Sequence, residues 1–302
     1  MKAPGGLRVI SVVNNKGGVG KTSMAKAISE YFAIVHGKSV LGIDVDAQCS
    51  YSLRYLEMEA ESDSDGSYKP PVSEEFDPND PEMAGWNGRS CSADLYMDMT
   101  YGVTPYETPY HGIHVLPGWG SKLRTIELVR REEVELRILA RMREFLWTED
   151  IADIYDIVVI DTPPAKSPVT RSVLRASTDL VIPTKLDQVS MEGVYGMLRF
   201  YKDEKHRRGG DDTPLNLVGI LPNMVRKNTR QTKQMIASLM GEGSVLSEYV
   251  LPHSVGLRTA FDAVNAKEDR PDSVFQLSQN DPARVEAQAA CDEIWRRMNA
   301  NG

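Results

Sequence analysis

The residues with the clearest chemical potential lie in the segment NKGGVGKTS at residues 15–23. Its glycines allow a backbone to wrap closely around phosphate oxygens and to aim several N–H groups at them. Lys21 would supply a positive charge to the β- and γ-phosphates, and Thr22 a hydroxyl group to Mg²⁺. The segment therefore predicts a loop that binds ATP or ADP together with Mg²⁺. Its candidate nucleotide-binding residues are Lys16, Gly17, Gly18, Val19, Gly20, Lys21, Thr22 and Ser23.

This loop departs in two ways from the usual phosphate-binding pattern, G-x-x-x-x-G-K-[ST]. Asn15 occupies the position of the first glycine, and Lys16 adds a second lysine where the pattern requires no particular residue. A strand-like segment, the loop, Gly-Lys-Thr and a helix-like segment still follow one another in the order that a nucleotide site needs. The residues alone leave open whether the site is damaged or carries an additional working cation.

Carboxylates stand at the ends of two apolar segments. Asp44 and Asp46 close the segment 40–46, and Asp161 follows four apolar residues. Open α/β sheets bind ligands at the carboxyl ends of their strands, and residues two apart in a strand share a face. The pattern of Asp161 is the Walker B arrangement, in which a carboxylate holds Mg²⁺ through water. We therefore expect these three carboxylates at the phosphate edge of a sheet.

The elements that position these residues follow from hydrophobic periodicity. Residues 8–13 and 40–46 have the pattern of buried strands, and residues 22–35 have helical period, with Gly37 as a helix stop. A strand, loop, helix and strand in this order form a crossover unit with parallel strands. We therefore predict an α/β fold with a doubly wound, mostly parallel sheet. Further strands are expected at 114–116, 157–161, 180–183 and 217–221, and further helices at 123–147, 170–177, 188–203 and 229–240.

One stretch breaks this alternation. Residues 57–82 contain ten acidic residues and a single basic one, Lys69, together with four prolines. Such a composition favours a solvated surface segment over a buried one. Because the α/β pattern resumes afterwards, we expect a single domain over 1–302 with an acidic surface insertion at about 57–112.

The composition limits the kind of protein. With 41% hydrophobic and 26% charged residues, the chain resembles an ordinary globular protein, and no apolar run reaches the roughly 20 residues of a membrane span. No signal peptide is visible, and three widely spaced cysteines favour a reducing cytoplasm over a disulfide framework. The net charge of −8 means that any affinity for nucleic acid must come from a local patch.

The motifs together carry a family resemblance. NKGGVGKTS, DVDAQ and VVIDTPP, in this order and spacing, resemble the ParA/MinD group of deviant Walker A ATPases, a type of P-loop NTPase. The later segments TDLVIPTKLDQVSMEGVYGML and VLPHSVGLRTAFD resemble the ParA branch, in its short form without an N-terminal helix-turn-helix. The resemblance implies an ATPase that hydrolyses ATP to ADP and phosphate, slowly unless a partner stimulates it.

The resemblance also implies roles for individual residues. The lysine that matches Lys16 reaches across an ATP-bound sandwich homodimer to the partner's phosphates, so the second lysine would be an added working part. Asp46 would act in hydrolysis with Lys16 and Lys21, and Asp44 would belong to the surroundings of Mg²⁺, with Thr22 and Asp161 as further ligands. Asn223 would hydrogen-bond adenine, and Pro252 would pack on it.

A basic region suggests a second ligand. Residues 199–233 contain nine lysines and arginines against four acidic residues. This region is either a solvated surface or, as the resemblance implies, a surface for sequence-independent DNA binding by the ATP dimer. The expected function is an ATP-dependent DNA partition or cargo-positioning ATPase, cytoplasmic and nucleoid-associated, released by a ParB-like centromere-binding or cargo-adaptor protein. Its candidate DNA contacts are Arg199, Arg207, Arg208, Arg226, Lys227, Arg230 and Lys233.

Two alternatives remain open at this point. A MinD-like ATPase that cycles on the membrane and regulates division-site placement would use the same switch with a C-terminal amphipathic helix. The apolar stripe there comprises Cys291, Ile294, Trp295 and Met298, but nearby acidic residues oppose an anionic bilayer, so core docking is favoured and a membrane partner is not expected. A metal-bearing reductase lacks paired contexts for Cys49 and Cys91, and a pair such as His111 and His114 is usually structural.

Overall fold

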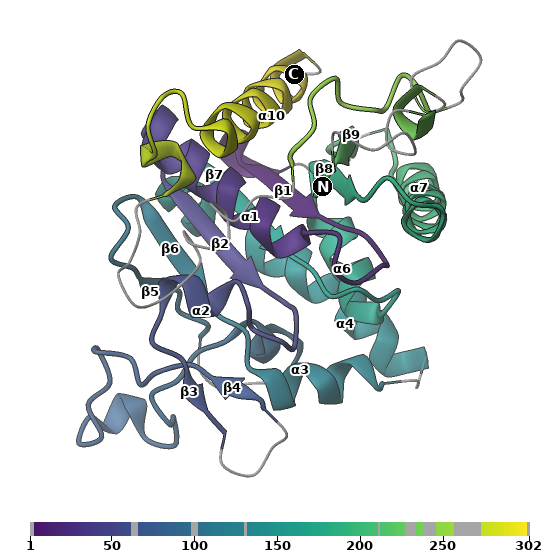
Figure 1. The fold of residues 1–302 in the computed structure, drawn as a ribbon. Helices are drawn as coiled ribbons and strands as arrows, with labels where there is room; N and C mark the ends of the chain where they lie inside the picture. Colours follow the sequence, from purple (N-terminus) through teal and green to yellow (C-terminus); the bar gives the residue numbers. More distant parts are fainter. Residues whose placement is uncertain are drawn as a thin grey trace.

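The computed structural model describes residues 3–61, 66–97, 102–129, 132–210, 212–226, 234–237, 239, 246–256 and 273–300. A seven-stranded sheet in the order β5-β6-β2-β7-β1-β8-β9 forms its centre (Figure 1). All neighbouring strands run parallel except the edge pair β5 and β6. The strands are β1 (Arg8–Val12), β2 (Val40–Asp44), β5 (Tyr106–Glu107), β6 (Ile113–Leu116), β7 (Ile157–Asp161), β8 (Asp179–Thr184) and β9 (Asn216–Pro222).

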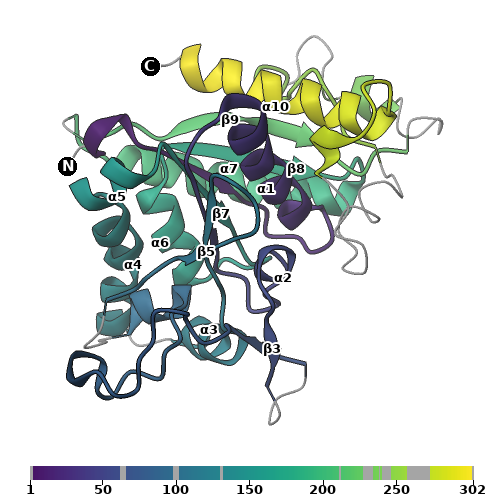
Figure 2. The same cartoon turned by 90° about the vertical axis from the view of Figure 1, so that its left-hand side faces the viewer.

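Helices cover both faces of this sheet, as a doubly wound fold requires. On one face, α1 and α10 pack over the central strands, and α4 and α6 lie on the opposite face (Figure 2). The helix α7 covers β8 and β9 beside α6. The helices are α1 (Lys21–Glu30), α2 (Ser52–Tyr55), α3 (Gly120–Glu127), α4 (Glu132–Leu146), α5 (Glu149–Ile154), α6 (Pro168–Ala176), α7 (Gln188–Arg207) and α10 (Pro282–Ala300).

The central strands are apolar because both of their faces are buried. Alternate residues of β1 enter opposite cores: Ile10 packs with α1 and α10, whereas Val9 packs with the helices of the other face. Continuous apolar strands are typical of a parallel sheet covered on both sides. The predicted fold class is therefore confirmed, and the six predicted parallel strands agree with the observed strands to within two residues at each end.

One predicted helix is wrong in its bounds, and another lies mostly outside the described residues. Residues 123–147 were expected to form one helix, but α3 ends at Glu127 and α4 begins at Glu132. The apolar stripe is continuous because Ile126 and Ile138 reach the same core from two separate helices. The predicted helix 229–240 lies mostly outside the described residues, of which 234–237 and 239 are helical.

The C-terminal helix α10 is docked on the sheet. Cys291, Ile294 and Met298 are at most 1% exposed, and Trp295 packs against the same core. Arg297 fixes the helix further by donating to the carbonyl oxygens of Val218 and Val250. Core docking of this stripe is confirmed. In the described part of the chain, no helix has the length and apolar character that crossing a bilayer demands.

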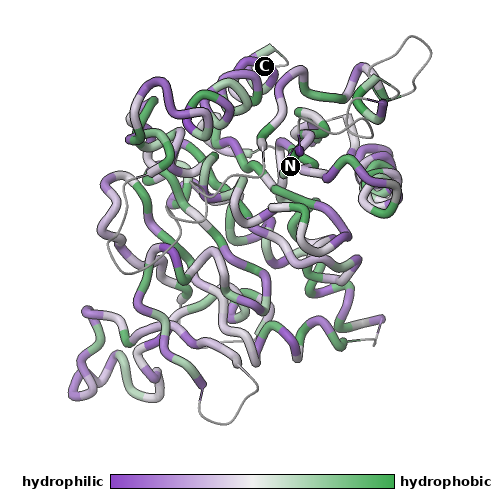
Figure 3. Tube along the Cα trace, in the orientation of Figure 1, coloured by the Kyte–Doolittle hydropathy of each residue, from purple (hydrophilic) through white to green (hydrophobic). Residues whose placement is uncertain are grey.

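The expected insertion carries a small sheet of its own. The strands β3 (Glu59–Ala60) and β4 (Tyr68–Lys69) pair antiparallel, separately from the main sheet. The rest of the insertion is mostly loop with short 3-10 turns at Pro81–Met83 and Ser92–Tyr96, and it ends in the edge strand β5. Figure 3 shows the loops of this region, at the lower left, as largely hydrophilic in comparison with the green central strands.

Candidate nucleotide site

The parallel register brings the candidate carboxylates together. Asp161 at the end of β7 is the register partner of Val12 on one side and of Asp44 on the other. The phosphate-binding loop starts directly after Val12, and α1 begins at Lys21. The loop, Asp44 and Asp161 therefore meet at the carboxyl edge of three adjacent strands, as expected from the sequence.

The loop between β1 and α1 depends on glycine conformations. Gly18 and Gly20 have φ values of +66° and +81°, a region that disfavours other residues. A Cβ atom on Gly20 would lie 2.3 Å from Nδ2 of Asn223, so the loop tolerates no side chain there. Lys21 Nζ turns back toward the loop and donates to the carbonyl oxygen of Lys16 at 3.3 Å.

Asp161 has the features of a cation ligand. Its Oδ2 atom accepts a hydrogen bond of 2.7 Å from the Thr22 hydroxyl, while its buried Oδ1 atom has no hydrogen-bond partner. Burial, and then the charge of Asp44, raises the pKa of Asp161 well above its usual value. An anionic oxygen without a donor at a buried position is costly unless a cation or proton compensates it. Mg²⁺ therefore fits beside Asp161 and Thr22.

No set of three or more acidic, histidine or cysteine side chains within the described ranges forms a metal site. Mg²⁺ is commonly held by one or two carboxylates together with water and substrate phosphates. A hydroxyl and a carboxylate oxygen are both hard ligands of the type that Mg²⁺ prefers. His114, one of the two histidines considered above, instead shares a hydrogen bond with the Tyr155 hydroxyl.

Asp44 is held by its neighbours and thereby shapes the next loop. Its carboxylate accepts hydrogen bonds from the backbone N–H of Ser52 and Asp46 and from the Ser52 hydroxyl. Burial, and then the charge of Asp46, raises the pKa of Asp44 to about 6. Because three donors already engage its oxygens, Asp44 is better placed to brace the magnesium surroundings than to ligate the ion directly.

Asp46 and Lys21 carry opposite charges in the same buried region. Burial raises the pKa of Asp46 and lowers the pKa of Lys21. The charges of Asp161 and Asp46 partly oppose the shift of Lys21, and the charge of Lys21 partly opposes the shift of Asp46. The Asp46 side chain accepts from the backbone N–H of Gln48, which holds it within the turn after β2. That turn also contains Cys49, a non-glycine residue with a φ of +54°. Such strain is common at functional loops.

The two lysines of the loop point in different directions. Lys21 is 6% exposed, whereas the Lys16 side chain is 34% exposed and its Nζ lies 3.9 Å from a Glu192 carboxylate oxygen on α7. The Lys16 backbone N–H is fixed by the Asn14 side chain at 3.0 Å. The Lys16 side chain therefore extends from the loop toward α7 and is partly exposed.

The two residues predicted to contact adenine lie at the same edge. Asn223 is 3% exposed, and its side-chain N–H donates to the carbonyl oxygen of Val19 at 3.0 Å, so in the structure it supports the loop. Its neighbour Met224 has a φ of +53°, which is the second non-glycine residue of this kind in the described chain. Pro252 is exposed. Adenine contacts by Asn223 and Pro252 stay predictions.

The basic residues divide into three groups. Arg199, Arg207 and Arg226 are exposed. Arg208 is different, because its guanidinium group is only 4% exposed and donates to carbonyl oxygens at the end of α6, including those of Leu174 and Ser177. Since Arg208 is engaged in holding two helices together, we remove it from the candidate DNA surface. The remaining candidates, Lys227, Arg230 and Lys233, lie outside the described residues.

Two glycines of α7 were not singled out from the sequence. A Cβ atom on Gly193 would lie 2.4 Å from Asn14 Oδ1 and 2.6 Å from Lys16 Cγ, and one on Gly196 would lie 3.0 Å from Asn15 Nδ2. The helix can therefore approach the start of the phosphate-binding loop only because these positions lack side chains. Their spacing of three residues on a helix was the available signal, but the partner segment could not be identified without the fold.

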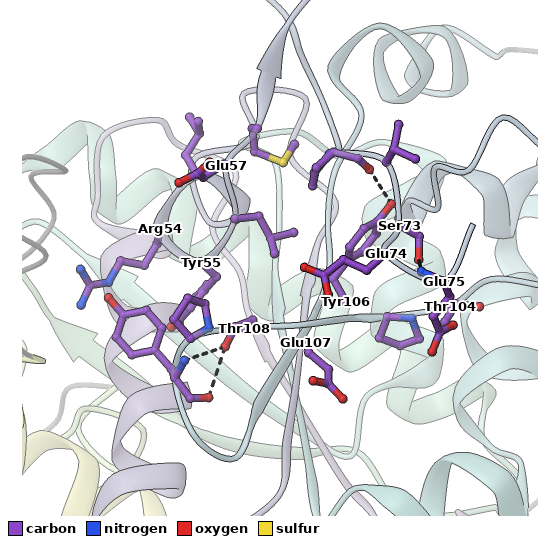
Figure 4. A pocket seen from close by; sticks show the side chains of 18 residues that line it. Arg54, Tyr55, Glu57, Ser73, Glu74, Glu75, Thr104, Tyr106, Glu107 and Thr108 are labelled. Atoms are coloured by element: carbon purple, nitrogen blue, oxygen red, sulfur yellow. Dashed lines mark hydrogen bonds between the residues drawn. The ribbon is translucent and has the colours of Figure 1, made fainter. Parts of the chain in front are cut away.

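A separate cavity lies beside the edge strand β5. Its volume is about 930 Å³, and segments 53–58, 71–75 and 104–110 line it (Figure 4). The Tyr106 hydroxyl donates to the Pro71 carbonyl oxygen, and the Thr108 hydroxyl donates to the Ile113 carbonyl oxygen. The carboxylates on its wall are exposed: Glu57, Glu74, Glu75 and Glu107.

The doubly wound sheet, the glycine-rich loop with Gly20-Lys21-Thr22 and the paired Thr22 and Asp161 define a P-loop nucleotide-binding protein with an added lysine. The chain belongs to the CobQ/CobB/MinD/ParA nucleotide binding domain family, whose model matches residues 10–263. The chromosome-partitioning ATPase Soj of Thermus thermophilus is 29% identical over 256 residues, which cover 84% of each chain.

Solved structures share the fold at lower identity. The apo form of McdA from Cyanothece has a TM-score of 0.69 and 16% identity, and the match covers 96% of this chain and 99% of that one. Cobyrinic acid a,c-diamide synthase from Mycobacterium smegmatis, with bound ADP and magnesium, has a TM-score of 0.65 and 19% identity over 98% and 97% of the chains. A common fold with different activities means that function must be argued from the site.

Proposed function

We propose that this protein is an ATP-dependent partition or cargo-positioning ATPase. ATP would join two copies into a sandwich dimer, the dimer would bind DNA without sequence preference, and hydrolysis would release it. The observation that carries the proposal is the contrast between two lysines of one loop. Lys21 is turned into its own loop, whereas Lys16 reaches outward onto α7. A partly exposed lysine side chain beside a phosphate site is suited to a triphosphate on a second copy.

The chain's own residues would hold the substrate and the attacking water. Lys21, the loop N–H groups and the N-terminus of α1 would bind the phosphates, and Mg²⁺, beside Thr22 and Asp161, would neutralise charge on the β- and γ-phosphates. Asp46 would orient water for attack on the γ-phosphate. No strong general base is present among these residues, which fits slow hydrolysis that a ParB-like or cargo-adaptor partner accelerates.

The Lys16 assignment is tested by dimerisation. In sedimentation experiments with Mg²⁺ and ATP, Lys16→Ala should bind ATP but remain a monomer, while the unsubstituted protein dimerises. Lys38→Ala removes a lysine that pairs with Asp156 ahead of β2, remote from the loop, and should behave as the unsubstituted protein. An intact ATP dimer of Lys16→Ala would overturn the role in trans.

The role of Asp46 is tested by the lifetime of the ATP state. Asp46→Ala should retain nucleotide binding, lose hydrolysis and accumulate as a DNA-bound dimer, because the water would no longer be oriented. Single-turnover measurement of phosphate release provides the readout. A rate equal to that of the unsubstituted protein would contradict the assignment.

The DNA surface is tested by charge reversal. Arg199→Glu and Arg226→Glu should each weaken ATP-dependent binding to duplexes of unrelated sequence by a similar factor, because phosphate contacts carry no sequence information. The affinity of the unsubstituted protein should also fall steeply with salt. Arg124→Glu, an exposed position on α3, is the control for a change in net charge. Unchanged binding by both test variants would remove this surface from the proposal.

A further inference from the structure

A third lysine lies beside the phosphate-binding loop. Lys185 follows β8 directly, and its Nζ atom is 3.7 Å from the position that a Cβ atom on Gly18 would occupy. Apart from the residues next to Gly18 in the chain, no other atom of the described residues lies within 4 Å of that position. The Lys185 side chain is half-buried. It therefore borders the loop that is expected to hold phosphate.

The backbone around Lys185 is tied to the loop and its surroundings. The Asn14 side-chain N–H donates to the Pro183 carbonyl oxygen at 2.9 Å, and the Asn223 backbone N–H donates to the Thr184 carbonyl oxygen at 2.8 Å. These contacts fix the end of β8 against the start of the loop on one side and against the end of β9 on the other. The backbone from which the Lys185 side chain extends is thus held in place, and its ammonium group borders Gly18.

The electrostatic surroundings of the three lysines differ. Lys21 has Asp161 and Asp46 as nearby opposite charges, and Lys16 has Glu192. Among the residues that the structure describes, no hydrogen bond or ion pair is formed by the Lys185 ammonium group. A half-buried cation without a protein anion, beside a loop of N–H donors, is complementary to an anionic ligand.

We propose that Lys185 is a third phosphate-binding lysine, which contacts the phosphate chain of the nucleotide bound to its own protomer. The proposal rests on the nucleotide site of the proposed function and adds a residue to it. Lys21 would approach the phosphates from the end of α1 and Lys185 from the end of β8. The assignment is to the same protomer because the ammonium group already borders its own Gly18. A flexible ammonium group can follow any of several phosphate oxygens as a point charge.

The test compares ligands that contain phosphate with and without adenine. Lys185→Gln should bind Mg²⁺–ADP about tenfold more weakly in calorimetric titration, a loss of about 1.4 kcal/mol. Magnesium pyrophosphate, measured as a competitor of ADP, should weaken by a similar factor, because it carries the same phosphate groups without the base. Lys185→Arg keeps the charge and should recover most of the affinity. Lys38→Gln is the matched control, since it removes the same charge at the opposite end of the strands.

Two results would overturn the assignment. Equal ADP affinity for Lys185→Gln and the unsubstituted protein would remove Lys185 from the site, and a loss for ADP without a loss for pyrophosphate would place its effect away from the phosphates. The thermal unfolding temperature of each variant shows whether the fold is intact, and Lys185→Arg remains informative if the glutamine variant unfolds. Absence of ADP binding by the unsubstituted protein would instead overturn the nucleotide site itself.

Discussion

The cavity beside β5 and the phosphate edge of the sheet both carry carboxylates, and each is lined by several separate segments. The cavity encloses about 930 Å³, yet its glutamates are exposed and its Tyr106 and Thr108 hydroxyl groups are bonded to nearby carbonyl oxygens. At the phosphate edge, Asp44 and Asp161 are fully buried, and one Asp161 oxygen has no hydrogen-bond partner. The cavity therefore offers space for a ligand, whereas the phosphate edge has a buried carboxylate oxygen without a hydrogen-bond partner.

The difference between exposed and buried carboxylates indicates where a ligand is needed. Water satisfies an exposed carboxylate at little cost, whereas a buried one requires a proton, a cation or a donor. Burial, and then a neighbouring carboxylate, raises the pKa values of Asp44 and Asp161. Burial lowers the pKa of Lys21, and the charges of Asp161 and Asp46 only partly oppose that effect. The nucleotide site is therefore identified by buried groups whose charge is costly without a ligand. The cavity is larger, but its exposed carboxylates do not need a ligand.

A large effect is expected from the closest approach at the phosphate edge. Gly20→Ala would place Cβ 2.3 Å from Asn223 Nδ2 at a φ of +81°, so the loop must move away from β9. We expect ATP affinity to fall by about 100-fold, or roughly 2.8 kcal/mol, in calorimetric titration.

The control for this variant lies within the insertion. Gly66→Ala places alanine at a similar φ of +71° with nothing within 4 Å. It should reduce the free energy of unfolding by about 1 kcal/mol, the cost of the left-handed conformation, with ATP affinity unchanged. Similar ATP affinities for the two variants would show that the contact with Asn223 does not shape the site.

The sequence was sufficient for the parts of the site that depend on local pattern. The alternation of apolar segments predicted the parallel strands and the placement of Asp44 and Asp161 at one edge, where the structure makes them register partners. The Gly20-Lys21-Thr22 pattern predicted the start of α1 to within one residue. These features follow from periodicity of 2 and 3.6 residues and from glycine conformation, which are visible in one sequence.

Other features required the three-dimensional structure. Arg208 belongs to a basic run, but only the packing of α6 against α7 shows that its guanidinium group is engaged by carbonyl oxygens. Lys185 and Gly193 come near the loop through contacts between segments about 170 residues apart in sequence, as for Asn14 and Pro183. The break between α3 and α4 was missed because both helices present apolar residues to one core. Long-range packing has no signature in local periodicity.

A second variant at the phosphate edge sharpens the role of α7. Gly193→Ala would gain about 1 kcal/mol of helix propensity, but its Cβ would lie 2.4 Å from Asn14 Oδ1. Asn14 cannot yield without losing its bonds to Lys16 and Pro183. We therefore expect ATP-dependent dimerisation to weaken about tenfold, as measured by sedimentation, because it needs Lys16. The affinity of the monomer for ADP should be nearly unchanged.

Gly196→Ala provides a graded control for Gly193→Ala. Its Cβ would lie 3.0 Å from Asn15 Nδ2 and from Lys166 Nζ, which are ends of side chains that can move. Dimerisation of Gly196→Ala should change less than that of Gly193→Ala. The reverse order, or no effect of either variant, would contradict the idea that α7 positions Lys16.

A smaller effect is expected from the ion pair that holds Lys16 against α7. The pair has a distance of 3.9 Å, and its side chains are 34% and 65% exposed, so its contribution is about 0.5 kcal/mol or less. Glu192→Gln should therefore tighten ATP-dependent dimerisation by about twofold, because Lys16 is released toward a second copy. Glu144→Gln on α4 removes an exposed charge of the same kind and should have no effect. Weaker dimerisation of Glu192→Gln would mean that Glu192 contributes to the dimer itself.

The smallest expected effect is at the cavity. The double variant Glu74→Gln, Glu75→Gln removes two exposed charges that water already solvates, so Mg²⁺–ATP affinity should stay within twofold and stability within about 0.5 kcal/mol. The same change of carboxylate to amide in Asp161→Asn should abolish Mg²⁺-dependent ATP binding, because the buried oxygens no longer offer a charge to the cation. Calorimetric titration of both variants with Mg²⁺–ATP compares how the same change from carboxylate to amide affects affinity in the two regions. If the double variant lost Mg²⁺–ATP affinity to an extent comparable with Asp161→Asn, the cavity would have to be counted as part of the nucleotide site.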